Sequence, residues 1–173
     1  MELRKEEIAS MKIGTIIISG ILLVFVVIQL IPNELPPVKA ENPQDLLKSD
    51  LISESVGKLI RRSCYSCHSN ETEYPWYSYV APSSWLVAKD VREGREALNF
   101  SDWESLEMLD KLALLDDVVI EVQEGTMPMG IYTWMHPSAK LSDEQRIAII
   151  DWAEEAMDII VEEDEEEWEE DAE

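Results

Sequence analysis

The two cysteines of this 173-residue chain stand three positions apart, in the run Cys64-Tyr65-Ser66-Cys67-His68. On one helical turn, two thiols at this spacing can each form a thioether to a vinyl group of the same haem. The histidine directly after the second cysteine can then bind the iron as the proximal ligand. We therefore predict one covalently attached haem c, with its iron, held by Cys64, Cys67 and His68.

Three other chemistries also use two closely spaced thiols. A dithiol redox site usually follows a strand, whereas the apolar residues of 51–62 have the spacing of a helix. A zinc site needs four ligands, and His136 would have to join Cys64, Cys67 and His68. A disulfide within Cys-x-x-Cys closes a very short loop and contributes little stability. The haem is the favoured interpretation, and the other three stay open at this point.

The second axial ligand decides which chemistry such a haem supports. A methionine thioether saturates the iron and raises the reduction potential, which suits electron transfer. Met127 is the first candidate because Pro128 holds its backbone extended in a loop. Met129 is an alternative that would point the opposite way in an extended chain, and His136 and Met135 are further ones. An open position would instead suit gas sensing or peroxide chemistry.

Aromatic and arginine side chains between the motif and this loop can complete a haem pocket. Trp76, Tyr77 and Trp85 can wall a porphyrin, and their polar tips can bond a propionate. Arg95, like its neighbour Arg92, can pair with a propionate through charge-assisted hydrogen bonds. A solvated position on a helix surface is the alternative for both arginines.

The pattern along the chain predicts helices and no long strand. Ser101 with Glu104, and Ser142 with Gln145, form capping boxes that predict helix starts, and Gly125 predicts the end of a helix. In the last helix, apolar residues recur at three- and four-residue spacing, which predicts a packed face: Ile147, Ile150, Ala153, Met157 and Ile160. We predict an all-α, cytochrome c-like domain over residues 44–161, in which the first and last helices pack around the haem.

Residues 13–31 form an uncharged, largely apolar segment. As a helix, nineteen residues at ~1.5 Å each would span roughly the 30 Å of a hydrocarbon core. Arg4, Lys5 and Lys12 precede the segment, so the positive-inside rule predicts a cytoplasmic N-terminus over 1–12. We expect a single-pass anchor in the bacterial cell membrane, with the haem domain on the periplasmic, extracytoplasmic side. A cleaved signal peptide is the alternative.

Two further segments flank the predicted domain. Residues 32–43 are rich in proline and predict a stiff extended spacer. Residues 162–173 include ten acidic side chains within a formal net charge of −23, which predicts a disordered tail or a frayed extension of the last helix. Such a charge favours a basic partner protein and disfavours nucleic acid, whose phosphates it would repel.

Several further motifs occur in order along the chain: Tyr74-Pro75-Trp76-Tyr77, Ala81-Pro82-Ser83-Ser84-Trp85-Leu86, Val91-Arg92-Glu93-Gly94-Arg95, Met127-Pro128 and His136-Pro137. With the Cys-x-x-Cys-His run, they make the chain resemble the haem-binding-domain family of small, membrane-anchored, c-type cytochrome-like proteins of bacterial envelopes. The resemblance implies a single covalent haem ligated by His68, with a methionine of the Met127-Pro128 pair as its partner. Met129-Gly130 and the acidic tail depart from the family pattern.

These observations together predict a membrane-tethered, extracytoplasmic monohaem cytochrome c. It would pass single electrons between redox partner proteins and would act as a carrier rather than as an enzyme. The alternatives are a haem-based sensor or ligand-binding protein and a haem peroxidase, either of which would have an open or labile sixth ligand.

Overall fold

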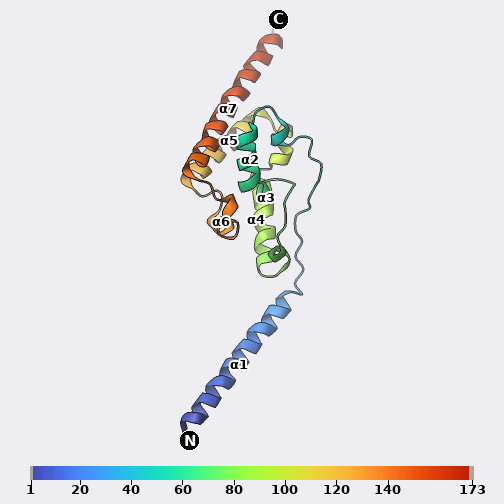
Figure 1. Ribbon diagram of the computed structural model, residues 1–173. Helices are drawn as coiled ribbons and strands as arrows, with labels where there is room; N and C mark the ends of the chain where they lie inside the picture. Colours follow the sequence, from blue (N-terminus) through green and yellow to red (C-terminus); the bar gives the residue numbers. More distant parts are fainter. Residues whose placement is uncertain (1, 172–173) are drawn as a thin grey trace. The chain divides into compact units, whose positions relative to one another are not determined.

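The computed structural model describes the backbone of residues 2–171 and the side chains of residues 12–166 (Figure 1). Its described residues form helices and loops and contain no strand, so the predicted all-α class is confirmed. The chain divides into two compact units. The first comprises the residues up to Pro36 together with Tyr74–Lys89, and the second comprises Pro37–Glu73 together with the residues from Asp90 onward.

The first unit contains α1 (Glu2–Ile28), η2 (Trp76–Tyr79) and the beginning of α4 (Ser83–Ala97). The side-chain amide of Gln29 bonds the backbone of Ala81 twice, donating to the carbonyl at 3.0 Å and accepting from the N–H at 2.9 Å. Asn33 donates to the carbonyl of Ser84 at 2.9 Å. Within this unit, the segment that follows α1 is therefore fastened to the segment around η2.

The predicted membrane anchor over residues 13–31 is wrong. Among the residues that the structure describes, no helix is both long enough and apolar enough to cross a bilayer. The helix α1 ends at Ile28 and Gln29 begins a turn, so the helical residues 13–28 rise about 24 Å at ~1.5 Å each, short of a ~30 Å hydrocarbon core. The predicted localisation in the bacterial cell membrane, with a periplasmic haem domain, falls with the anchor. The side chains of Arg4 and Lys5, on which the orientation depended, lie outside the described residues.

The second unit holds the remaining elements: η1 (Leu46–Lys48), α2 (Glu54–Ser63), α3 (Tyr65–His68), the end of α4, η3 (Phe100–Ser105), α5 (Met108–Glu124), α6 (Gly130–Met135), η4 (Pro137–Ala139) and α7 (Asp143–Asp171). Figure 1 shows α5 alongside α7, and these two helices form the most extensive helix pair of the unit. The helix α2 packs on α7 as well. The indole N–H of Trp152 donates to the carbonyl of Leu51 at 2.8 Å. The predicted packing between the early and late helices is thus confirmed.

The predicted packed face of α7 is confirmed except at Ile147. Ala153 and Ile160 belong to the core, and Ile150 and Met157 are partly buried against it. Ile149 and Ala153 are fully buried and Ile160 is nearly so, whereas Ile147 is 56% exposed. Ile149, Ala153 and Ile160 keep the three- to four-residue periodicity of a packed face. Ile147 therefore lies outside the face that contacts α2 and α5.

One predicted capping box is confirmed and the other is wrong. Ser142 and Gln145 bond each other's backbone N–H groups at 3.3 and 3.0 Å at the start of α7. The Ser101 hydroxyl instead donates to the buried Asp45 carboxylate at 3.0 Å and accepts from the Asn70 N–H at 3.0 Å. It is therefore engaged in a tertiary network rather than in a helix cap. Gly125 ends α5 as predicted, with φ of +75°.

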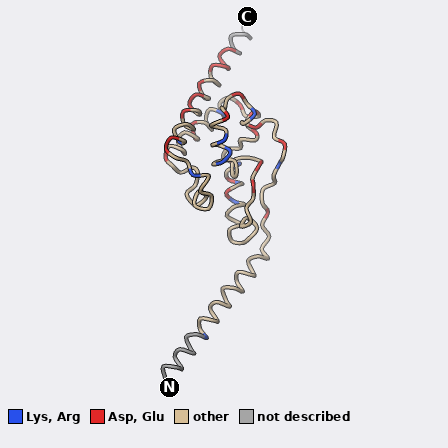
Figure 2. The backbone as a smooth tube through the Cα atoms, in the orientation of Figure 1, with Lys and Arg blue, Asp and Glu red and all other residues tan. Residues whose placement is uncertain are grey.

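The helical backbone of α7 continues through the acidic segment to Asp171. Acidic residues recur along the described part of this extension (Figure 2). The expectation of an extended last helix therefore describes this segment better than a disordered tail does. Whether it forms a functionally separate part stays a prediction.

Candidate haem site

The Cys-x-x-Cys-His run forms one helical turn. Cys64 joins α2 to α3, and its carbonyl accepts the N–H groups of Cys67 at 3.1 Å and of His68 at 3.0 Å. The side chains of Cys64 and Cys67 are free thiols. The turn is the local geometry that thioether attachment to one haem needs.

The thiols are held in their protonated form. Burial, with a smaller contribution from Cys67, raises the pKa of Cys64 to about 12. Burial also raises the pKa of Cys67 to about 11, with Asp90 adding to the shift and Arg95 opposing it. A redox-active dithiol needs a lowered pKa, because the thiolate is the nucleophile. This environment therefore disfavours the thioredoxin-type alternative.

The zinc alternative is also disfavoured. Within the described part of the chain, no group of three or more His, Cys, Asp or Glu side chains is placed to hold a metal ion. His136 stacks on the ring of Tyr132, with 4.6 Å between the ring centroids. A four-ligand zinc site at the motif would require a different arrangement of these residues.

His68 is oriented by a hydrogen bond to the backbone. Its Nδ1 lies 3.1 Å from the carbonyl oxygen of Leu98. Because a carbonyl can only accept, Nδ1 carries the proton and Nε2 keeps its lone pair for a metal. Burial lowers the pKa of His68, although backbone carbonyls of Leu98 and Gly94 oppose this shift. The imidazole is therefore neutral at pH 7, which is the form that ligates iron.

Two cavities of about 240 Å³ each adjoin the motif, and all their lining residues belong to the second unit. They share six lining residues: Ser63, Cys64, His68, Ala97, Met127 and Pro128. One cavity extends to Cys67, Gly94 and Tyr132, and the other extends into the apolar core at Phe100, Leu114 and Ile149.

These walls fit a haem. Both thiols, an oriented imidazole and a thioether border the same space, and most of the remaining walls are apolar. The hydroxyl of Ser63 is buried and has no hydrogen-bond partner among the described residues. A buried polar group without a partner is costly in a finished site, so this hydroxyl is available to a bound group. The donor set is the one that covalent haem attachment uses.

Met127 is the sixth-ligand candidate that lines both of the cavities that His68 lines. Met129 lines one of the two cavities, whereas His136 lines neither. The helix α6 is tied to the attachment turn by a 3.0 Å hydrogen bond between the hydroxyls of Tyr132 and Ser66. Met127 as the iron ligand, with Met129 and His136 as alternatives, stays a prediction that this geometry favours.

The other predicted pocket residues have different surroundings. Trp76, Tyr77 and Trp85 belong to the first unit, and their role as porphyrin walls stays a prediction. Arg95 donates to the carbonyls of Ser69 and Pro37, each at 2.8 Å, and to the Thr72 hydroxyl at 2.9 Å. Its guanidinium therefore holds the segment after the motif, and its predicted contact with a propionate is untested.

Residues that the sequence reasoning missed also position the site. A Cβ added at Gly94 would lie 2.9 Å from the carbonyl oxygen of Cys67 and 3.1 Å from its Cβ. Glycine therefore lets α4 approach the backbone of the attachment turn. An isolated glycine within a helical pattern is a usable signal for such a close approach. Nothing in the sequence pattern identified Leu98 as the partner of His68.

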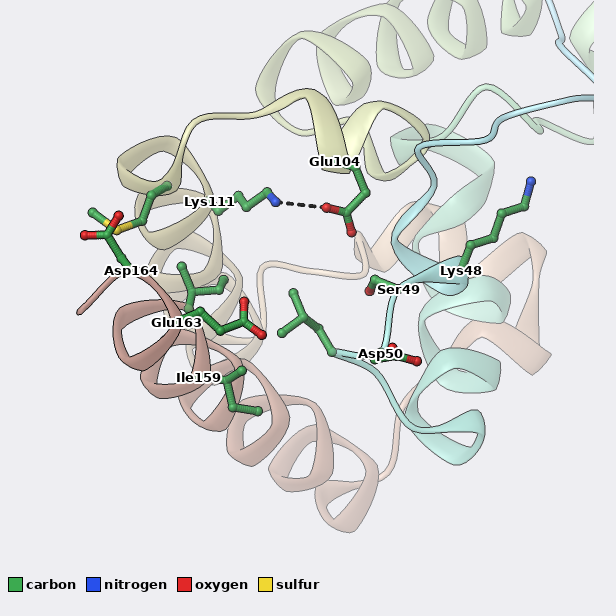
Figure 3. Close-up of a pocket in the computed structure, with 11 residues that line it drawn as sticks. Lys48, Ser49, Asp50, Glu104, Lys111, Ile159, Glu163 and Asp164 are labelled. Carbon is green, nitrogen blue, oxygen red and sulfur yellow. Dashed lines mark hydrogen bonds and ion pairs between the residues drawn. The ribbon is translucent and has the colours of Figure 1, made fainter. Parts of the chain in front are cut away.

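A more open groove of about 540 Å³ lies elsewhere in the second unit (Figure 3). Charged side chains of both signs line it, including Lys48, Asp50 and Glu163, and Lys111 pairs with Glu104 at 3.1 Å. None of its lining residues belongs to the attachment motif. The groove is larger than either cavity, but its charged walls do not suit an apolar porphyrin.

The all-α fold and the thiol, imidazole and thioether groups around one apolar space define a small helical haem protein. The sequence profile of the family described as "Haem-binding domain" matches residues 23–155. The chain therefore belongs to the haem-binding-domain family, as its motifs predicted, and haem is its cofactor.

The chain is also similar to a curated protein, the cytochrome c peroxidase Ccp of Escherichia coli (strain K12). The two are 30% identical over 112 residues, which is 61% of this chain and 24% of that protein. The chain thus spans about a quarter of the length of this relative. No solved structure matches the chain.

Proposed function

We propose that this protein is a monohaem c-type cytochrome that transfers single electrons. The observation that supports this most strongly is the shared space bordered by Cys64, Cys67, His68 and Met127. When bound, the haem supplies a reversible ferrous–ferric couple. In the proposal, the two cysteines hold it covalently, and His68 and Met127 are the axial ligands.

The protein's own residues keep the ligands in place and limit access by water. The Leu98 carbonyl fixes the tautomer and the orientation of His68. Phe100 lies against His68, with its ring centroid 6.3 Å from that of the imidazole, and is 2% exposed. Such an apolar wall lowers the local dielectric and favours the form of the site with less charge.

A haem peroxidase is the second candidate function, and the similarity to a cytochrome c peroxidase favours it. That similarity covers about a quarter of the relative. A peroxidase would need an open iron position with a base beside it. His136, the base considered from the sequence, stacks on Tyr132 and lines neither cavity, so electron transfer is the better-supported proposal.

The proposed partners are redox proteins with a basic docking surface. The chain carries a formal net charge of −23, and acidic residues recur on α7 (Figure 2). Opposite charges speed the encounter of two proteins, and salt screens that attraction. The rate of electron transfer to a basic partner should therefore fall as ionic strength rises.

Absorption spectra with and without Met127 test the proposal. The ferric protein should show the weak long-wavelength charge-transfer band of methionine-ligated haem, and Met127→Ala should lose it. The ferrous wild-type protein should bind carbon monoxide slowly, because the sixth position is filled. Rapid binding, together with turnover of hydrogen peroxide, would instead support the peroxidase.

A further inference from the structure

A guanidinium from α7 holds the segment that carries Met127. Nη1 of Arg146 donates to the carbonyl of Val122 at 2.9 Å and to the carbonyl of Met127 at 3.0 Å. Val122 lies in the last turn of α5, and Met127 lies beyond the Gly125 turn that ends this helix. One side chain therefore ties the end of α5 to the proposed ligand residue.

The loop between Val122 and Met127 also forms hydrogen bonds to α5. The N–H of Met127 donates to the carbonyl of Glu121 at 3.2 Å, and the hydroxyl of Thr126 donates to the same carbonyl at 2.9 Å. Both backbone polar groups of Met127 thus have partners, one on α5 and one on α7. The direction in which its thioether leaves the backbone is correspondingly restricted.

The backbone of Arg146 is held in place at the start of α7. Its N–H donates to the Ser142 carbonyl at 2.9 Å in the first turn of α7, next to the capping box of Ser142 and Gln145. Ile149, less than one turn further on, is fully buried in the core. The backbone that carries the guanidinium is therefore anchored at both of these points.

We propose that Arg146 is a positioning residue for the sixth ligand of the haem. Its hydrogen bond fixes the carbonyl of Met127 and thereby keeps the Met127 thioether in the wall of the cavity that His68 also lines. This inference rests on the proposed role of Met127 as the iron ligand. Among the described residues, Arg146 itself lines neither cavity, so it acts through the hydrogen bond to Met127.

Competition with added imidazole tests this role in the full-length protein with haem attached. Replacing Arg146 with leucine removes a charged donor from two carbonyls, which should raise the affinity of the ferric protein for imidazole roughly tenfold or more. Arg146→Lys keeps the charge but carries it on a more flexible side chain, and it should fall between that variant and wild type. The long-wavelength methionine–iron band should weaken in the same order.

Arg62→Leu is the matched control. Arg62 donates to the side chain of Gln145, the residue beside Arg146, at 3.2 Å and does not reach Met127. This variant should bind imidazole with wild-type affinity. If Arg146→Leu, or Arg146→Lys should the leucine variant not fold, behaves like Arg62→Leu, the inference is overturned.

Combining Arg146→Leu with Met127→Ala distinguishes a failure of this inference from a failure of the proposed function. In Met127→Ala protein the thioether is gone, so Arg146→Leu should change the imidazole affinity no further. If Met127→Ala leaves the spectrum of the wild-type protein unchanged, the proposed ligand itself is wrong. If Met127→Ala abolishes the band but Arg146→Leu has no effect, only the positioning role is refuted.

Discussion

Replacing Gly94 with alanine tests whether close packing of α4 on the attachment turn supports the haem site. The new Cβ would lie 2.9 Å from the carbonyl oxygen of Cys67 and 3.2 Å from its carbonyl carbon. Both are backbone atoms, so neither can rotate away as the end of a side chain can. The turn that carries Cys67 and His68 would have to shift, or α4 would have to move outward.

Two opposing effects determine how much Gly94→Ala changes the free energy of unfolding. Alanine in place of glycine stabilises a helix interior by about 1 kcal/mol, whereas overpacking typically costs about 1–3 kcal/mol. We expect Gly94→Ala to lower the free energy of unfolding by about 1 kcal/mol in total. Gly57→Ala provides the matched control, because Gly57 is also inside a helix and its added Cβ would meet only the end of the Leu47 side chain, at 3.1 Å.

The comparison of the two variants cancels the helix preference of alanine. Gly57→Ala should be at least as stable as wild type, so the two variants should differ by about 2 kcal/mol. For a protein of this size this corresponds to about 4–8 °C in Tm, measured by thermal unfolding with circular dichroism. The ratio of haem to protein should also fall in Gly94→Ala alone. Equal stability and equal haem content in the two variants would refute the packing argument.

Two further predictions concern titrating groups. Burial raises the pKa of Glu71, but the hydrogen bonds from Arg61 at 2.8 Å and from Asn42 at 3.2 Å, together with the positive charges of Arg61 and Lys48, outweigh it, so the pKa is lowered overall. The charged form of Glu71 thus contributes stability above its unfolded pKa of about 4.3, and that contribution is lost as the pH falls through the lower folded value. Glu71→Gln should therefore cost less than about 1 kcal/mol at pH 7 and nothing in strong acid, as urea unfolding at several pH values can measure. In haem-free protein, pKa values of about 12 for Cys64 and about 11 for Cys67 predict that alkylation by iodoacetamide rises about tenfold per pH unit between pH 7 and 10.

Each of these two has a clear contrary result. A Glu71→Gln variant whose stability deficit persists unchanged at low pH would show that packing, not charge, is involved. For the thiols, mass spectrometry would contradict the burial argument if the alkylation rate reached a plateau near pH 8. Protein unfolded in urea is the control, because its thiols should titrate near the ordinary value.

The local geometry of the attachment turn was predictable because its residues are adjacent in sequence. Cys64, Cys67 and His68 need only one helical turn to come together, and the structure has that turn. The capping box of Ser142 and Gln145 was likewise a local signal and is confirmed. Each of these two patterns involves only residues within about one helical turn of one another.

The sequence-based predictions that were wrong or missing concern contacts between segments far apart in the chain. Ser101 matches a capping box, but its hydroxyl bonds Asp45, which is 56 residues away. No pattern in the sequence could anticipate that a buried carboxylate would need this donor. The same holds for two other contacts between distant segments. The carbonyl of Leu98 accepts a hydrogen bond from His68, and Arg146 donates a hydrogen bond to the carbonyl of Met127. The membrane prediction failed for a different reason, because apolar composition alone did not locate the end of α1 at Ile28.

The central claim is that one haem is held covalently by the two thiols of the attachment turn. Intact-mass spectrometry of the full chain, produced in bacteria that attach haem to Cys-x-x-Cys-His motifs, tests it directly. We predict the mass of the polypeptide plus a single haem, which survives denaturation and is lost when Cys64 and Cys67 are both replaced by serine. A colourless protein at the bare polypeptide mass, with two thiols open to alkylation after unfolding, would contradict the claim.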